Sequence, residues 1–144
     1  MAERERLVAK IQALVEADPK VPPVIDLDEY FTGNDDQWCI APNQWEYGRP
    51  ELSEFYARFK AIRQRDDVQL ILVGIHDDWV MSIDEPDWPA AENIHIYTTA
   101  TEVEVNSWIT GLESDGAGEG WPYGCHAQAP EPEKGFRVMT VYWN

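Results

Sequence analysis

Six carboxylates and two tryptophans lie between residues 77 and 92, a stretch that contains no lysine or arginine. These residues are Asp77, Asp78, Trp79, Asp84, Glu85, Asp87, Trp88 and Glu92. Carboxylates that lie close together repel one another unless water or a cation compensates their charge. A basic partner would supply that cation, and tryptophans can fill pockets in an interface. We therefore predict that these eight residues bind a basic macromolecular partner. The alternative is a solvated loop whose tryptophans fold inward.

The chain is strongly acidic, and the imbalance is concentrated in one segment. Its 144 residues include 27 acidic and 11 basic side chains, which gives a net charge of −16. Residues 66–133 hold fifteen of the acidic side chains and none of the basic ones. Such a field repels nucleic acid and anionic membranes and attracts basic surfaces, so we expect neither nucleic-acid nor membrane binding. Solubility alone is the simpler explanation of this acidity.

Motifs for nucleophilic and metal chemistry are weak. The chain has no GxSxG sequence, and Cys125 and His126 are neighbours on a loop, which is no evidence that their side chains meet. The sequence His76-Asp77-Asp78 is the best candidate for a metal site, but successive strand residues point to opposite faces of a sheet. The stretch ESDGAGE lacks the alternating oxygen ligands of a calcium loop. We predict no catalytic residue, no metal site and no cofactor.

Tryptophans and paired carboxylates together also suit the recognition of sugars. The seven tryptophans are spread over separate elements, which argues against an enclosed sugar cleft in a short chain. Helical spacing places Trp108 in the core, whereas Trp79, Trp88 and Trp121 lie in or beside loops and are the better candidates for exposure. A small-molecule enzyme that uses paired carboxylates and a general acidic adaptor protein are the alternatives to a dedicated binding protein.

Apolar spacing and turn residues predict the elements that must position these side chains. Residues 3–17 form an amphipathic helix that ends at Asp18-Pro19. The spacing of Leu27, Tyr30 and Phe31 predicts a short helix, with a strand as the alternative. The further predictions are a short strand at 38–41, a loop to residue 50, a helix at 50–65, strands at 68–76, 79–83 and 93–99, and a proline-containing loop at 84–93.

The C-terminal third begins with a helix signal and ends with a strand. Thr101 and Glu104 form a T-x-x-E capping box at the start of a helix that contains Val105 and Trp108. Residues 113–134 are predicted to form a long loop rich in glycine and proline, and residues 136–143 a closing strand. This order predicts an α+β fold in a single domain of residues 1–144, with a mixed or antiparallel sheet and helices packed mainly on one side.

Two features of the sequence bear on the compartment. The N-terminus is charged from residue 3 and lacks an unbroken apolar run, unlike a signal peptide. No segment has the apolar length of a membrane span. We therefore expect a cytoplasmic protein in which Cys39 and Cys125 are reduced thiols.

Four segments, in this order, resemble a group of small bacterial immunity proteins: LDEYFTGNDD, WCIAPN, the helix end and strand AIRQRDDVQLILVGI, and the terminal VYWN. The similar residues are Leu27, Tyr30, Phe31, Gly33, Asn34, Asp35, Asp36, Ile40, Asn43, Arg65, Val68, Trp143 and Asn144. Such proteins accompany toxins of polymorphic or type VI secretion systems. The resemblance implies a cytoplasmic antidote that binds a cognate toxin domain, often a nuclease with a basic active site, and blocks it without catalysis of its own. It assigns no toxin-contacting residue.

Overall fold

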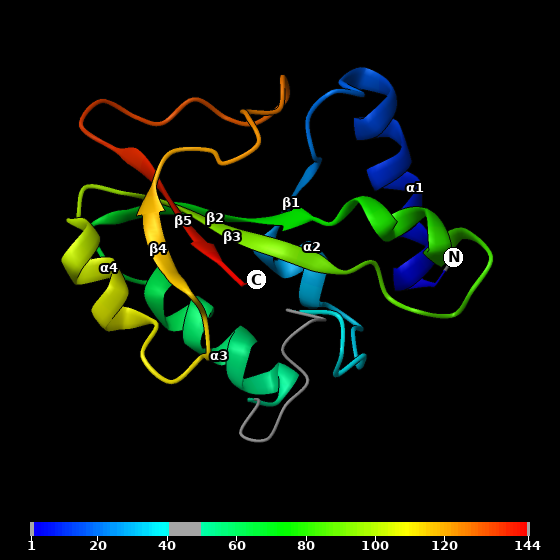
Figure 1. Cartoon of the computed structure of the whole chain (residues 1–144), viewed down its shortest axis with the longest axis horizontal. Coiled ribbons are helices and arrows are strands. Elements are labelled where there is room, and N and C mark those ends of the chain that lie inside the picture. Colours follow the sequence, from blue (N-terminus) through cyan, green and yellow to red (C-terminus); the bar gives the residue numbers. More distant parts are fainter. Residues whose placement is uncertain (1, 41–49, 144) are drawn as a thin grey trace.

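The computed structural model describes residues 2–40 and 50–143. Within these residues, five antiparallel strands form one sheet in the order β1-β2-β3-β5-β4 (Figure 1). The elements in chain order are α1 (Glu3–Ala17), β1 (Val24–Asp26), α2 (Leu27–Phe31), α3 (Leu52–Arg63), β2 (Val68–Ile75), the 3₁₀ helix η1 (Asp77–Ile83), β3 (Ala91–Thr98), α4 (Glu102–Trp108), β4 (Gly116–Glu119) and β5 (Arg137–Tyr142). The predicted α+β class with an antiparallel sheet is confirmed.

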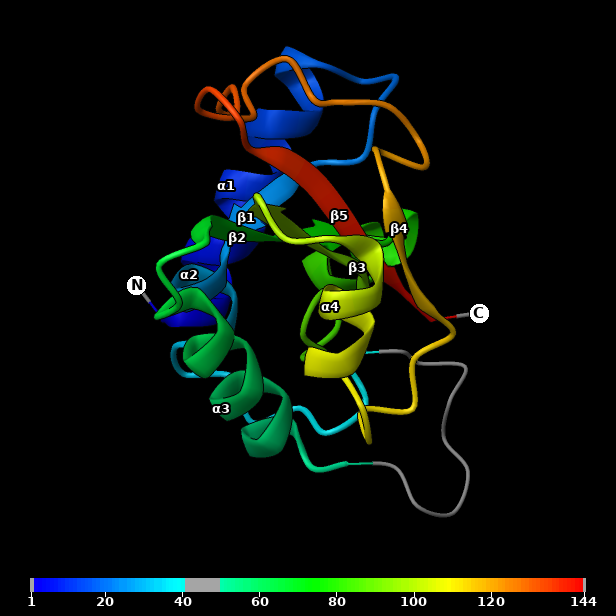
Figure 2. The same cartoon turned by 90° about the vertical axis from the view of Figure 1, so that its left-hand side faces the viewer.

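The two faces of the sheet are covered in different ways. Side chains alternate along each strand, so Val73 of β2 and Ile96 of β3 point into the main core, which also contains Phe55 and Phe59 of α3. Figure 2 shows α3 and α4 on this side of the sheet, with the segment between β4 and β5 on the other side. The prediction that helices pack mainly on one side is therefore confirmed.

The opposite face is covered by the loop of residues 120–136, not by a helix. Trp121 packs against the smaller apolar cluster on this face, which contains Leu72, Tyr97 and Val138. The Tyr97 hydroxyl donates a hydrogen bond to the carbonyl of Pro130 at 2.7 Å. Buried backbone groups need such partners when a long loop lies over a sheet.

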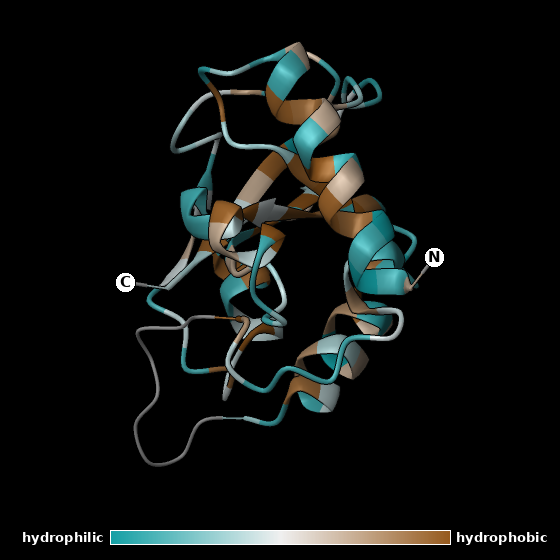
Figure 3. Ribbon diagram, turned by 90° about the vertical axis from the view of Figure 1, so that its right-hand side faces the viewer, coloured by the Kyte–Doolittle hydropathy of each residue, from teal (hydrophilic) through white to brown (hydrophobic). Residues whose placement is uncertain are grey.

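The helices begin where the sequence indicates. The buried stripe of α1 consists of Leu7, Ile11 and Leu14, and Figure 3 shows polar and apolar residues alternating along the helices of this side of the molecule. The Thr101 hydroxyl accepts the Glu104 N–H at 3.2 Å, and the Glu104 carboxylate accepts the Thr101 N–H at 3.2 Å, so the capping box is confirmed. Among the described residues, none of the helices has the length and apolar character of a membrane span.

Three predictions of local structure are wrong. Residues 79–83 lie in η1, not in a strand. Strand β4 lies inside the predicted loop at 113–134. Its sequence, GAGE, has no alternation of apolar and polar residues, and it forms a strand through backbone pairing with β5. Of the predicted strand at 38–41, the described residues 38–40 form one isolated bridge, between Ile40 and Ala91. The loop predicted after it, at 41–49, lies outside the described residues.

Candidate functional site

The acidic stretch begins with η1, which a histidine caps. The Nδ1 atom of His76 accepts the backbone N–H of Asp78 at 3.1 Å. Asp77 and Asp78 occupy the first turn, where the partial positive charge of a helix N-terminus favours carboxylates. In a 3₁₀ helix the side chains of residues i and i+3 eclipse, and Trp79 and Ser82 accordingly point inward together. The stretch predicted as a strand at 79–83 is therefore a capped helix.

The outer side of η1 exposes apolar side chains. Val80 is 49% exposed, Met81 61% and Ile83 48%. The helix is held against α1, because the Arg4 guanidinium donates a hydrogen bond to the carbonyl of Ser82 at 2.6 Å. In Figure 1, η1 is the green helix beside α1, at the end of the molecule opposite α4.

Carboxylates adjoin these apolar side chains in the chain on both sides. Asp77 and Asp78 come before them, and Asp84, Glu85 and Asp87 follow on the connecting loop, all five with exposed side chains. We call this surface the η1 patch: Val80, Met81 and Ile83 together with Asp77, Asp78, Asp84, Glu85 and Asp87. The sixth predicted carboxylate, Glu92, lies at the start of β3 and is half-buried.

Of the two predictions for the tryptophans of this stretch, the one in which they fold inward is correct for Trp79 and Trp88. Trp79 is only 8% exposed and Trp88 only 7%, and both belong to the main core. The Trp88 indole N–H donates to the buried carbonyl of Tyr30 at 3.1 Å, which satisfies the polar atom of a side chain whose apolar body fills the core. Trp121 is half-buried, with its ring centroid 4.4 Å from that of His95. The apolar part of the candidate surface therefore comes from Val80, Met81 and Ile83, which are not among the eight residues predicted from the sequence.

The rest of the acidic segment does not join this surface. Residues 66–133 hold fifteen carboxylates, of which six lie between 77 and 92, so nine lie elsewhere. Asp67 pairs with Arg65 at 2.9 Å at the α3–β2 turn. Glu119 on β4 lies 3.5 Å from Arg137 on β5. Carboxylates of the segment therefore also lie away from the η1 patch, at the α3–β2 turn and on β4, where arginines pair with them.

The histidines and cysteines are engaged structurally. Cys39 and Cys125 carry thiols and form no disulfide, as predicted. The Nε2 atom of His126 bonds the Leu14 carbonyl at 2.8 Å, and its Nδ1 accepts the Gln128 N–H at 3.0 Å. Partial burial raises the pKa of Cys125, whereas a reactive thiol has a lowered pKa. His126 is thus not placed as a base for its neighbour.

His76, Asp77 and Asp78, the best candidate for a metal site in the sequence, contact one another. The Nδ1 atom of His76 lies 3.2 Å from a carboxylate oxygen of Asp77 and 3.0 Å from one of Asp78. The same nitrogen caps η1, which occupies its lone pair when the ring is neutral. Within residues 2–40 and 50–143, no group of three or more His, Cys, Asp or Glu side chains could hold a metal ion.

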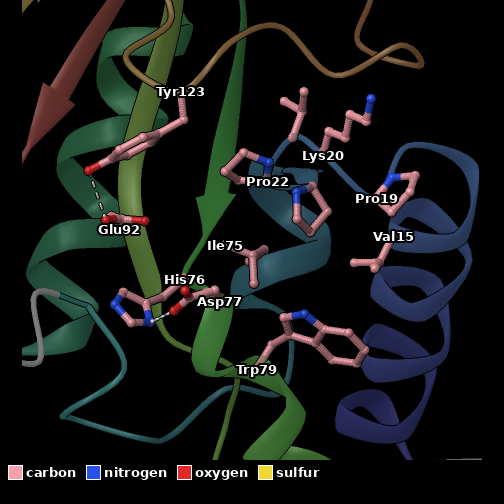
Figure 4. A pocket seen from close by; sticks show the side chains of 12 residues that line it. Val15, Pro19, Lys20, Pro22, Ile75, His76, Asp77, Trp79, Glu92 and Tyr123 are labelled. Atoms are coloured by element: carbon pink, nitrogen blue, oxygen red, sulfur yellow. Dashed lines mark hydrogen bonds and ion pairs between the residues drawn. The ribbon is translucent and has the colours of Figure 1, made fainter.

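An open cleft of about 490 Å³ adjoins the start of η1 (Figure 4). One wall comes from the end of α1 and the linker after it, with Val15, Pro19, Lys20 and Pro22. The other wall comes from the end of β2 and the start of η1 and of β3. It contains Ile75, His76, Asp77, Trp79 and Glu92, and Tyr123 of the 120–136 loop lies above it.

A tyrosine fixes one carboxylate beside this cleft. The Tyr123 hydroxyl donates a hydrogen bond to Oε1 of Glu92 at 3.1 Å. The negative charge of Glu92 raises the pKa of Tyr123, and the charge of Asp77 adds to the same effect. Tyr123 therefore stays a hydrogen-bond donor, and both carboxylates act on the same region of space.

Comparison with known proteins places this α+β chain in a protein family. Residues 2–141 match the family model described as "Uncharacterized protein YfbO family". The chain is 31% identical over 129 residues to a protein of Escherichia coli strain K12, "Uncharacterized protein YfbO". The aligned residues make up 88% of this chain and 87% of that relative. The protein therefore belongs to the YfbO family. No solved structure matches it significantly.

Proposed function

We propose that the η1 patch binds a basic surface of another protein, and that through this contact the chain acts as an immunity protein for a bacterial toxin domain. The observation that carries the proposal is the combination, on one anchored helix and its loop, of three exposed apolar side chains with five exposed carboxylates. Apolar contacts supply most of the binding energy of an interface, and charges steer the encounter and select the partner.

The anchoring of η1 supports a role in binding. The Arg4 bond to Ser82 and the His76 cap hold the helix in place before a partner arrives. A surface that is already ordered loses less conformational entropy when it binds. Val80, Met81 and Ile83 would be desolvated by a partner, and the carboxylates would remain at the rim, where water still solvates them.

The toxin-neutralising role is supported by the sequence resemblance to immunity proteins, and the charge is compatible with it. A nuclease toxin would present a basic, phosphate-binding active site, which an acidic protein can occlude. The family description and the name of the Escherichia coli relative give no activity, so this part of the proposal depends on the resemblance and on charge complementarity.

Co-expression with the product of the neighbouring open reading frame tests the proposed role. If that product is the cognate toxin, it arrests growth when expressed alone, and the present chain rescues growth and forms a tight complex with it. Failure of both rescue and complex formation rejects the immunity role. Several unrelated partners without a toxin among them would instead favour an adaptor protein.

Charge variants then test the surface. Replacing Asp84, Glu85 and Asp87 with Asn, Gln and Asn removes three negative charges from the η1 patch. We expect the variant to associate more slowly than the unmodified chain at low ionic strength. In high salt the unmodified chain loses its steering, so the two rates should converge, since exposed charges are screened beyond about 10 Å at 0.1 M salt.

The matched control removes the same charge at a distance from η1. The variant E113Q/E131Q/E133Q changes three exposed carboxylates that lie outside the patch. It should bind at close to the unmodified rate. Equal slowing by both variants would show that net charge, not the η1 patch, guides association.

A further inference from the structure

The cleft beside η1 combines apolar walls with negative charge on one side. Ile75 and Trp79 line one wall, and Val15 and Pro22 line the other. Its volume of about 490 Å³ falls within the range of small-ligand sites, about 300–1,000 Å³. Such walls suit a ligand with an extended apolar part.

The charged groups of the cleft are separated. Figure 4 shows Asp77 and Glu92 on one side of the cleft and Lys20 on the opposite side, pointing away from both carboxylates. The bond from Tyr123 uses one oxygen of Glu92, and a carboxylate retains further lone pairs for other donors. Both carboxylates line the cleft and their charges act on the same hydroxyl, that of Tyr123, while Asp77 also lies 3.2 Å from Nδ1 of His76. A ligand cation in the cleft is therefore attracted by both carboxylates.

We propose that this cleft receives the side chain of an arginine from the basic partner. The methylene stem of the arginine would pack on Trp79 and Pro22, and the guanidinium would donate hydrogen bonds to Glu92 and Asp77. A guanidinium is planar, presents five donors and is weakly hydrated, so it suits a half-apolar cleft with carboxylates better than an ammonium group does.

This inference deepens the proposed function and rests on it for the source of the arginine. Asp77 belongs to both the cleft and the η1 patch, and Trp79 lies on the inner side of the same helix. A partner seated on η1 would therefore lie at the mouth of the cleft. One arginine inserted there would fix the orientation of the partner, while the exposed side chains of η1 provide the wider contact.

The test uses the full chain and needs no partner protein. N-acetyl-arginine-methylamide is titrated while NMR follows the resonances of Trp79, Ile75 and Tyr123. We expect saturable shifts at these residues with a dissociation constant in the millimolar range. The citrulline analogue, a neutral isostere of arginine, should produce no saturable shift, and the lysine analogue should bind more weakly.

Variants identify the groups responsible. Glu92→Gln and Asp77→Asn should each weaken arginine binding by about threefold, the scale of a solvent-exposed charged pair. Lys20→Met removes a positive charge from the opposite wall of the cleft, which repels a guanidinium, and should strengthen binding. Glu133→Gln, an exposed carboxylate outside the cleft, should change nothing. The folded state of each variant is checked from its unperturbed core resonances.

Three results would overturn the assignment: equal binding of arginine and citrulline, equal binding of arginine and lysine, or arginine shifts that are unchanged in both carboxylate variants. These outcomes are separate from failure of the proposed function. A chain that binds arginine in the cleft but fails to rescue growth would disprove the immunity role alone. A chain that rescues growth but does not bind arginine would disprove the cleft assignment alone.

Discussion

The buried histidine on β3 should make the stability of the protein depend on pH. The Nδ1 atom of His95 lies 2.8 Å from the Thr140 hydroxyl, which itself donates to the carbonyl of Gly120 at 2.6 Å. A hydroxyl has one proton, so the imidazole must be the donor in the first bond. Burial lowers the pKa of His95 from 6.5 to about 3.

The sign of the effect follows from the lowered pKa. As pH falls below 6.5, the unfolded chain binds a proton at this residue that the folded chain does not bind, so stability is lost. The loss continues until the folded pKa of about 3 is reached. Between about pH 7 and pH 4.5, these two pKa values give a loss of about 2.5 kcal/mol in the free energy of unfolding.

Urea denaturation of the unmodified chain and of His95→Asn measures this loss. The asparagine keeps a donor for Thr140 and does not titrate in this range. The variant should be less stable at pH 7, because a smaller side chain leaves space in the core. Between pH 7 and pH 4.5 the free energy of unfolding should nevertheless fall less for the variant than for the unmodified chain. The difference between the two falls should be about 2.5 kcal/mol. An equal fall in the free energy of unfolding for both proteins would refute the conclusion that His95 is buried and neutral.

Two further predictions concern packing beside the candidate site. Trp88→Phe removes the indole donor to the Tyr30 carbonyl, which keeps only the longer bond of 3.5 Å from the Asn34 amide. Denaturation should show a loss of about 1–3 kcal/mol, from the lost hydrogen bond and the space left by the smaller ring; an unchanged stability would contradict this packing. Gly74→Ala places a Cβ atom 2.8 Å from Nε2 of His95 and should cost about 1–3 kcal/mol. Gly118→Ala, whose Cβ meets no atom within 4 Å, is the control for Gly74→Ala and should cost much less.

Much of the fold could be predicted from periodicity and capping residues. The apolar stripe of α1, the β-branched run of β2 and the Thr101–Glu104 box are local signals, and the structure agrees with all three. β4 has no such signal, because its stretch GAGE is held by backbone pairing to a strand some twenty residues later. Long-range pairing of this kind does not appear in a local pattern.

The candidate site could be predicted in part. The sequence identifies where carboxylates gather, since charge can be counted, and the structure places five of the six on η1 and its loop. The sequence does not identify which apolar side chains face water. Trp79 and Trp88 are drawn inward because the core needs their volume and Tyr30 satisfies one indole, whereas the eclipsed side chains of a 3₁₀ helix expose Val80 and Ile83.

The most direct test of the central claim is the affinity of the complex when the apolar part of the η1 patch is removed. The variant V80S/M81S/I83S keeps every carboxylate and should weaken binding of the neighbouring gene product by at least about thirtyfold, the loss of one interface hot spot. Val103→Ser changes an 80% exposed apolar side chain on α4 and should leave calorimetric affinity unchanged. Retention of full affinity by the triple variant would contradict the proposal that the η1 patch binds the partner.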